Sequence, residues 1–164
     1  MPAGTLLRMT SLSNPVSREP IMGNVHLLTL TCCNRQRLFE NAAHADVAMQ
    51  LLAAMDREGL TTSLAWLVMP DHVRWLAQLR GYPPGYCVQR FKARSSFLIN
   101  RHRGRNGAVW QAGYFDQVID NDASLPVRAR QVLAHPVSAG LAGKVGEYPH
   151  GWCRWPLQDA AIAR

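Results

Sequence analysis

The middle of the chain lacks acidic residues. No Asp or Glu occurs between His72 and Phe115, although the 164-residue chain contains eleven of them. The same segment holds eight of the eighteen Lys and Arg residues, and the rest of the chain has ten basic residues against its eleven acidic ones. The formal net charge of +7 therefore belongs to this segment. A positive field confined to one segment favours a polyanionic partner, although composition alone leaves a solvated basic face as an equal alternative.

Long apolar runs are also missing. No segment approaches the roughly 20 apolar residues that are needed to cross a bilayer, so we expect no association with a membrane. Residues 1–22 have neither the apolar core of a secretory signal nor a sustained hydrophobic period, and we expect a weakly ordered N-terminal segment there. Residues 23–164 are long enough for one compact core and too short for two ordinary domains, so we expect a single domain. The cysteines have neither disulfide-framework nor metal-ligand spacing, which favours a cytoplasmic protein with reduced thiols; they are Cys32, Cys33, Cys87 and Cys153.

The first half of the chain predicts a strand, a helix and a hairpin. Residues 24–32 are apolar and contain Val, Leu and Thr, which predicts a strand. Residues 42–58 are rich in alanine, carry apolar residues at helical spacing and stop at Gly59, which predicts a helix. The runs TTSLAWLVM and HVRWLAQL are separated only by Pro-Asp, so they predict two strands of an antiparallel hairpin.

The second half predicts a helix, a strand and a shorter helix. GYPPGYCVQRFKARSSFLINRHRGRNG opens with a Pro-Gly turn and continues as an amphipathic helix, and AVWQAGYFDQVID reads as an extended strand. DASLPVRARQVLAHPV predicts a short helix with Ser124 as its N-cap. This helix should end at His135, because Pro136 disfavours the α-conformation of the residue before it. We expect the remaining aromatic tail to wrap the core rather than extend the sheet.

The order of these elements predicts a ferredoxin-like α/β (α+β) fold. The β-α-β-β-α-β pattern forms an antiparallel sheet with helices on one face and an open face opposite, and here a C-terminal helix is added. Residues i and i+2 of a strand share one face, so His72 and Arg74 should lie together on the open face. Val73 and Trp75 should point into the core.

Basic residues of the long amphipathic helix and the loop after it are the main candidates for contact with a phosphate backbone. Arg90, Arg94 and Arg101 fall within a narrow arc of the helix, and further arginines continue into the loop. Such contacts fix the position of a nucleic acid without specifying its sequence. With Arg74, the candidate DNA-binding residues are Arg90, Lys92, Arg94, Arg101, Arg103 and Arg105.

Five motifs in the chain occur in an order that resembles a known family. Between about residues 24 and 150, the chain resembles the small single-domain HUH transposases, and among them the REP-associated tyrosine transposases most closely. The motifs are NRQRLFEN, MPDHVRWL, RFKARSSFLIN, VWQAGYFDQVI and HPVSAGL followed by EYP.

The resemblance implies a DNA strand transferase that depends on a divalent metal such as Mg²⁺ or Mn²⁺. In that family the hairpin carries His-hydrophobic-His, and the two imidazoles hold a metal that polarises the scissile phosphate. A tyrosine on the late helix attacks the phosphate to form a covalent phosphotyrosine, and a polar residue one turn later completes the metal site. The implied partner is single-stranded or hairpin DNA from a repetitive extragenic palindrome.

The chain departs from this pattern at each position. His72 occupies the first histidine position, but the second is Arg74, which has no lone pair to offer a metal. The family's Tyr-x-x-x-Asn-Pro reads here as QVLAHP, so Gln131 stands at the tyrosine position and His135 at the asparagine position. A glutamine amide cannot replace the nucleophile.

Two explanations of these departures compete. In one, an active nuclease has a rearranged site in which His72 and His135 bind the metal and Tyr114 supplies the nucleophile. In the other, which we favour, the nuclease centre is lost, the DNA-binding shell remains, and Arg74 contacts a phosphate. His135 is equally well explained as a helix-terminal residue that the helix dipole favours. A ferredoxin-like RNA-binding module is a third interpretation, against which the absence of the paired aromatic signatures of an RNA-recognition motif counts.

Overall fold

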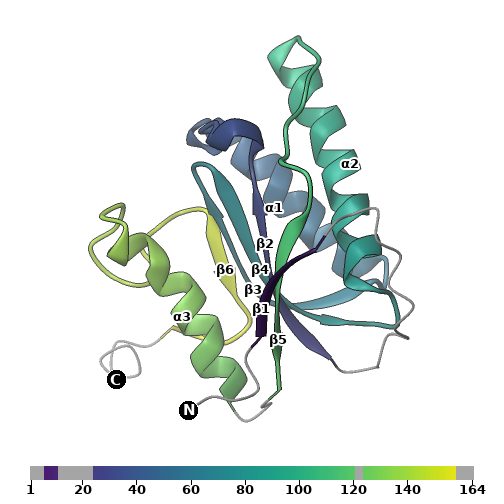
Figure 1. The fold of residues 1–164 in the computed structure, drawn as a ribbon. Helices are drawn as coiled ribbons and strands as arrows, with labels where there is room; N and C mark the ends of the chain where they lie inside the picture. Colours follow the sequence, from purple (N-terminus) through teal and green to yellow (C-terminus); the bar gives the residue numbers. More distant parts are fainter. Residues whose placement is uncertain (1–5, 11–23, 121–123, 158–164) are drawn as a thin grey trace.

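The computed structural model describes residues 6–10, 24–120 and 124–157, which form one antiparallel sheet with helices on both of its faces (Figure 1). The six strands lie in the order β1-β5-β2-β4-β3-β6. Their bounds are β1 Leu6–Thr10, β2 Val25–Thr31, β3 Thr61–Met69, β4 His72–Leu79, β5 Tyr114–Ile119 and β6 Gly151–Cys153.

Two helices cover one face of the sheet and a third packs on the other. Helix α1 contacts both α2 and β3, and these elements enclose the larger of two apolar cores. Helix α3 packs on the opposite face against β3, β4 and β6, over a second apolar cluster. The bounds of the helices are α1 Ala42–Arg57, α2 Pro84–Arg103 and α3 Leu125–Ser138, and two 3₁₀ turns precede α1, η1 Cys33–Arg35 and η2 Leu38–Glu40.

The central strands β5-β2-β4-β3, with α1 and α2, have the predicted ferredoxin-like arrangement. The hairpin pairs Met69 with His72 across Pro-Asp, and the whole of β4 follows the predicted alternation. Val73 and Trp75 are fully buried in the core under α1 and α2, where Trp75 Nε1 donates to Ser63 Oγ at 2.9 Å. Arg74 faces α3 instead. The predicted fold class and the predicted orientation of the β4 side chains are therefore confirmed.

Local chemistry explains the ends of α1. The Asn41 side chain accepts from the Ala43 N–H at 2.9 Å and so satisfies one of the free donors of the first turn. Near the other end, the Asp56 carboxylate accepts from the Thr61 hydroxyl at 2.6 Å and from the Ser63 N–H at 2.9 Å. These bonds connect the last turn of the helix to the start of β3 and fix α1 on the sheet.

The sheet has one more strand at each edge than the sequence predicted. Leu6–Thr10, within the segment expected to be a weakly ordered lead-in, pairs as β1 with β5, while the rest of residues 1–22 lies outside the described residues. In the tail, Gly151–Cys153 pairs with β3 instead of only wrapping the core. A Cβ at Gly151 would lie 2.7 Å from Leu133 Cδ1 of α3, so a larger residue there would require the Leu133 side chain to move.

The C-terminal helix corrects two further expectations. It passes through Pro136 and ends at Ser138 rather than His135. Pro136 is buried in the last turn and has no N–H to donate to Val132 O, but the Ala139 N–H still donates to His135 O and the Leu141 N–H to Pro136 O, so the helix closes beyond it. The helix also covers part of the face predicted to be open. No helix within the described ranges is long and apolar enough to cross a membrane.

Candidate functional site

The β3–β4 turn orients His72. The His72 ring donates from Nδ1 to Asp71 Oδ1 at 2.7 Å, and the second carboxylate oxygen of Asp71 accepts from Arg35 Nε at 3.1 Å. Partial burial raises the pKa of the Asp71 carboxyl, but the hydrogen bond from His72 and the charge of Arg35 outweigh it, so this pKa lies below its ordinary value. A charged Asp71 holds the His72 ring by Nδ1, which leaves Nε2 available to a ligand.

Helix α3 brings His135 to His72. The two ring centroids are 5.6 Å apart at an interplanar angle of 70°. Burial lowers the pKa of His135, and the nearby charges of Arg74 and His72 lower it further. His135 is therefore neutral near pH 7. The two histidines that were predicted to form a partial site do lie together.

Arg74 and Gln131 line a small cavity between the sheet and α3. The cavity has a volume of about 120 Å³. Burial lowers the pKa of Arg74, and within the described part of the chain no carboxylate pairs with its guanidinium. A half-buried, uncompensated guanidinium beside amide groups is suited to an anion. The lining residues are Leu27, Arg74, Leu76, Gln117, Ile119, Arg128, Gln131 and Val132.

The residues present do not fit a divalent metal. Mg²⁺ and Mn²⁺ prefer oxygen ligands, whereas this centre offers two imidazoles and a guanidinium that repels cations. Asp71, the neighbouring carboxylate, is engaged by His72 and Arg35. Among residues 24–120 and 124–157, no group of three His, Cys, Asp or Glu residues is placed to hold a metal ion.

Tyr114 does not reach this site, which corrects its assignment as an alternative nucleophile. It lies at the start of β5 with only 3% of its surface exposed, in the core on the α1 and α2 side of the sheet. Its hydroxyl is directed at α2, where a Cβ on Gly85 would lie 3.5 Å from the oxygen. His72 and His135 are on the opposite side. A phosphate held near His72 would therefore be separated from the Tyr114 hydroxyl by the sheet.

Three of the six basic residues predicted on the long helix and the loop after it are also engaged within the protein. Lys92 is 6% exposed and donates to Gln111 O at 2.7 Å and to Gly113 O at 2.6 Å, so its assignment to DNA binding is wrong. Arg94 donates to Glu58 Oε2 at 2.8 Å, and Arg90 reaches Oε1 of the same carboxylate at 3.2 Å. Glu58 lies just after α1, so a single carboxylate from outside the acid-free segment pairs with both arginines and offsets one of their two charges.

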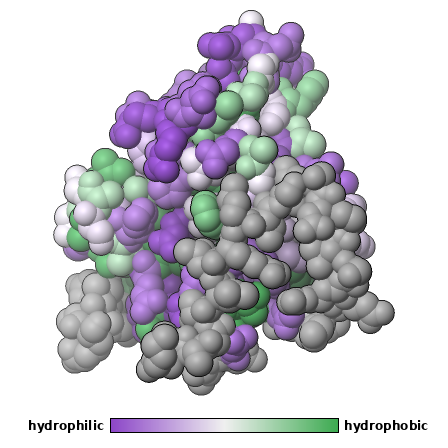
Figure 2. All heavy atoms as spheres, viewed as in Figure 1, coloured by the Kyte–Doolittle hydropathy of each residue, from purple (hydrophilic) through white to green (hydrophobic). Residues whose placement is uncertain are grey.

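The basic residues at the end of α2 remain accessible. Arg101 and Arg105 are exposed and line a pocket of about 550 Å³, while Arg103 is half-buried beside Asn100. Figure 2 shows hydrophilic residues gathered over the upper end of the molecule, where α2 ends. This end of α2 is therefore the accessible part of the predicted set of DNA-binding basic residues.

Three residues with a place in these sites were not predicted. Asp71 adjoins His72 in the sequence, so its role could have been found from the PDH motif. Arg35 could not, because its contact with Asp71 spans 36 positions and needs the fold. Phe97, which lines the α2 pocket, looked like one more apolar residue of an amphipathic helix.

Comparisons with known proteins agree with this geometry. The model of the family described as "Transposase IS200 like" matches residues 22–129, which include His72 and Arg74 but end before Gln131 and His135. The solved structure of a REP-associated tyrosine transposase bound to a REP hairpin shares the fold, with a TM-score of 0.63 and 17% sequence identity over 92% of this chain and 98% of that chain. Comparison with curated proteins gives no match. Since the family model spans well over half of the chain, this protein belongs to the IS200-like transposase family.

Proposed function

We propose that this member of the family binds hairpin or single-stranded DNA in the cytoplasm without cleaving it. The observation that carries the proposal is the side-chain set around the α3 cavity. Arg74 and Gln131 face this cavity, where the family pattern has its second histidine and its tyrosine, and the His72–His135 pair stands beside it. This set can hold a phosphate, and it has neither a metal site nor a nucleophile.

Arg74 supplies the binding energy of this centre. A guanidinium that is already partly removed from water loses little further hydration when a phosphate arrives, and it can donate two parallel hydrogen bonds. The amides of Gln117 and Gln131 can add donors around the same anion. The fixed charge of Arg74 thus takes over the phosphate contact that a metal makes in the family pattern.

Strand transfer needs a group that can form a bond to phosphorus. The Gln131 amide is not nucleophilic, and the Tyr114 hydroxyl lies across the sheet. The partner, by contrast, is supported by the comparison, because the solved transposase with this fold is bound to a REP DNA hairpin. We therefore assign to this chain the recognition step of the family and not its chemistry.

A binding titration tests this function. Labelled DNA hairpins, their RNA counterparts and blunt duplexes of equal length are titrated with the purified protein at fixed salt. The proposal predicts that DNA hairpins bind more tightly than blunt duplexes and at least as tightly as RNA. A dominant preference for RNA, or no binding to any DNA, contradicts it. Arg80→Gln serves as a control for charge, because Arg80 is exposed and lies at the far end of β4 from His72.

A further inference from the structure

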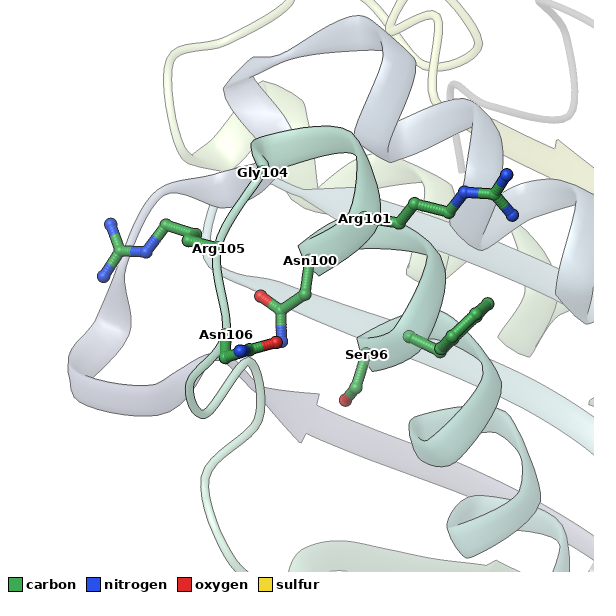
Figure 3. Close-up of a pocket in the computed structure, with 7 residues that line it drawn as sticks. Ser96, Asn100, Arg101, Gly104, Arg105 and Asn106 are labelled. Atoms are coloured by element: carbon green, nitrogen blue, oxygen red, sulfur yellow. The ribbon is translucent and has the colours of Figure 1, made fainter.

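The turn after α2 forms a defined pocket. Gly104 ends the helix in the left-handed conformation, with φ at 67°, and reverses the chain. The Arg105 N–H then donates to Asn100 O at 3.1 Å, and Asn100 Nδ2 donates to Gly107 O at 2.8 Å. The turn is thereby held against the last turns of α2. The resulting pocket has a volume of about 550 Å³ and is lined by Ser96, Phe97, Asn100, Arg101, Gly104, Arg105 and Asn106 (Figure 3).

Phe97 is the most exposed large apolar side chain in the described part of the chain. It is 64% exposed, although α2 buries its other phenylalanine, Phe91, completely. An exposed ring at this position adds nothing to the core. It offers a flat surface beside the pocket, on which another ring can stack.

The charges around this ring have one sign. Arg101 and Arg105 are exposed, and neither pairs with an acidic residue in the described part of the chain. Figure 3 shows them on opposite sides of the turn, with Asn100 and Asn106 between them. The dipole of α2 favours cations in its last turn, which accounts for Arg101 but not for Arg105, which lies beyond the helix, or for an exposed phenyl ring.

We propose that this pocket holds an unpaired nucleotide of the bound DNA strand, with its base stacked on Phe97 and its flanking phosphates at Arg101 and Arg105. The inference rests on the proposed function and adds a second contact to it. An aromatic ring between cations is the arrangement that binds single-stranded nucleic acid, because every base presents a face that can stack. The Ser96 hydroxyl and the Asn106 amide line the same pocket and can donate to the base edge.

The pocket and the Arg74 cavity lie toward the same end of the sheet. The loop after α2 is joined to η1 by the Cys33 N–H, which donates to Val109 O at 2.8 Å. The neighbouring Cys32 N–H donates to Asp71 O at 2.9 Å, next to His72. The pocket lies on the α2 face of the sheet and the Arg74 cavity on the α3 face, so a DNA molecule with a phosphate at Arg74 would pass around this end of the sheet, over η1, to place an unpaired extension at Phe97.

The test compares two DNA probes with the full-length protein. One is a blunt hairpin, and the other is the same hairpin with a short oligothymidine extension placed on either end in turn. We expect one extended hairpin to bind more tightly than the blunt one, and Phe97→Leu to remove at least about five-fold of its affinity while Phe97→Trp retains it. Tyr86→Leu is the matched control, since Tyr86 is an exposed aromatic at the other end of α2.

The outcomes separate this inference from the proposed function. If the blunt hairpin binds and neither extension adds affinity, or if Phe97→Leu and Tyr86→Leu weaken binding equally, the nucleotide pocket is refuted while DNA binding stands. If neither probe binds, the proposed function itself fails. A third outcome is that Phe97→Leu leaves the affinities for the blunt and the extended hairpin unchanged, while the pocket binds an acidic peptide. The pocket then serves a protein partner, and the inference is overturned.

Discussion

Replacing Arg74 by glutamine should weaken DNA binding without destabilising the protein. A charge-assisted hydrogen bond to a phosphate contributes about 1.5 to 3 kcal/mol, so the dissociation constant should rise roughly 10- to 150-fold. Because the Arg74 guanidinium is partly buried and has no carboxylate partner in the described part of the chain, its replacement also removes a desolvation cost. The free energy of unfolding should therefore stay within about 0.5 kcal/mol of its original value or increase.

Fluorescence anisotropy with a labelled DNA hairpin measures the first effect, and urea denaturation measures the second. Weaker DNA binding without a lower free energy of unfolding is expected only if Arg74 contacts a ligand and does not support the fold. An unchanged dissociation constant would refute the phosphate contact. A loss of stability as large as the loss of binding would show that Arg74 is structural. Arg80→Gln should change neither quantity appreciably.

Three other sets of substitutions probe the same regions of the molecule. Arg101→Ala with Arg105→Ala should reduce the slope of log affinity against log salt by about 0.7 to 0.9 for each phosphate that the variant no longer binds. Arg90→Ala with Arg94→Ala should change this slope much less, because Glu58 already pairs with both arginines. Burial lowers the pKa of Lys92 from 10.5 to about 8, so between these pH values the unfolded state binds more protons than the folded state, and the free energy of unfolding should rise with pH. Lys92→Met should abolish this rise, as measured by urea denaturation. It should also lower the free energy of unfolding by about 1 to 3 kcal/mol, because it leaves two carbonyls without a donor. Arg74→His with Gln131→Tyr restores the second histidine and the tyrosine of the family pattern, and only this double variant should give a covalent protein–DNA adduct with Mn²⁺ in a denaturing gel; an adduct with either single variant would contradict this assignment.

The fold was predictable because its signals are local. The alternation of β4 places Trp75 in the core and Arg74 opposite, and this pattern needs no tertiary information. The helix over 42–58 and the short Pro-Asp connection were also predictable from local sequence. β1 was not, since a five-residue strand on the edge of a sheet carries too short a pattern to read.

The candidate site was predictable only in part. Its position came from the order of motifs, and the structure places His135 beside His72 as that order implied. Whether each basic side chain is free or paired could not be predicted from the sequence. Glu58 pairs with Arg90 and Arg94 from a neighbouring segment and offsets one of their two charges, and Lys92 turns inward to two carbonyls, so a count of charges along α2 overestimates its free positive charge. Long-range pairing decides which basic residues can meet a phosphate.

DNA binding without cleavage is tested most directly by a gel assay of an end-labelled REP-type DNA hairpin with the purified protein and Mg²⁺ or Mn²⁺. Retarded, cleaved and covalently attached strands are scored separately. We expect retardation with neither cleavage nor a covalent adduct, because Arg74 and Gln131 replace a ligand and the nucleophile. A covalent adduct would contradict this expectation, and mapping the modified residue would show which hydroxyl had taken over the chemistry.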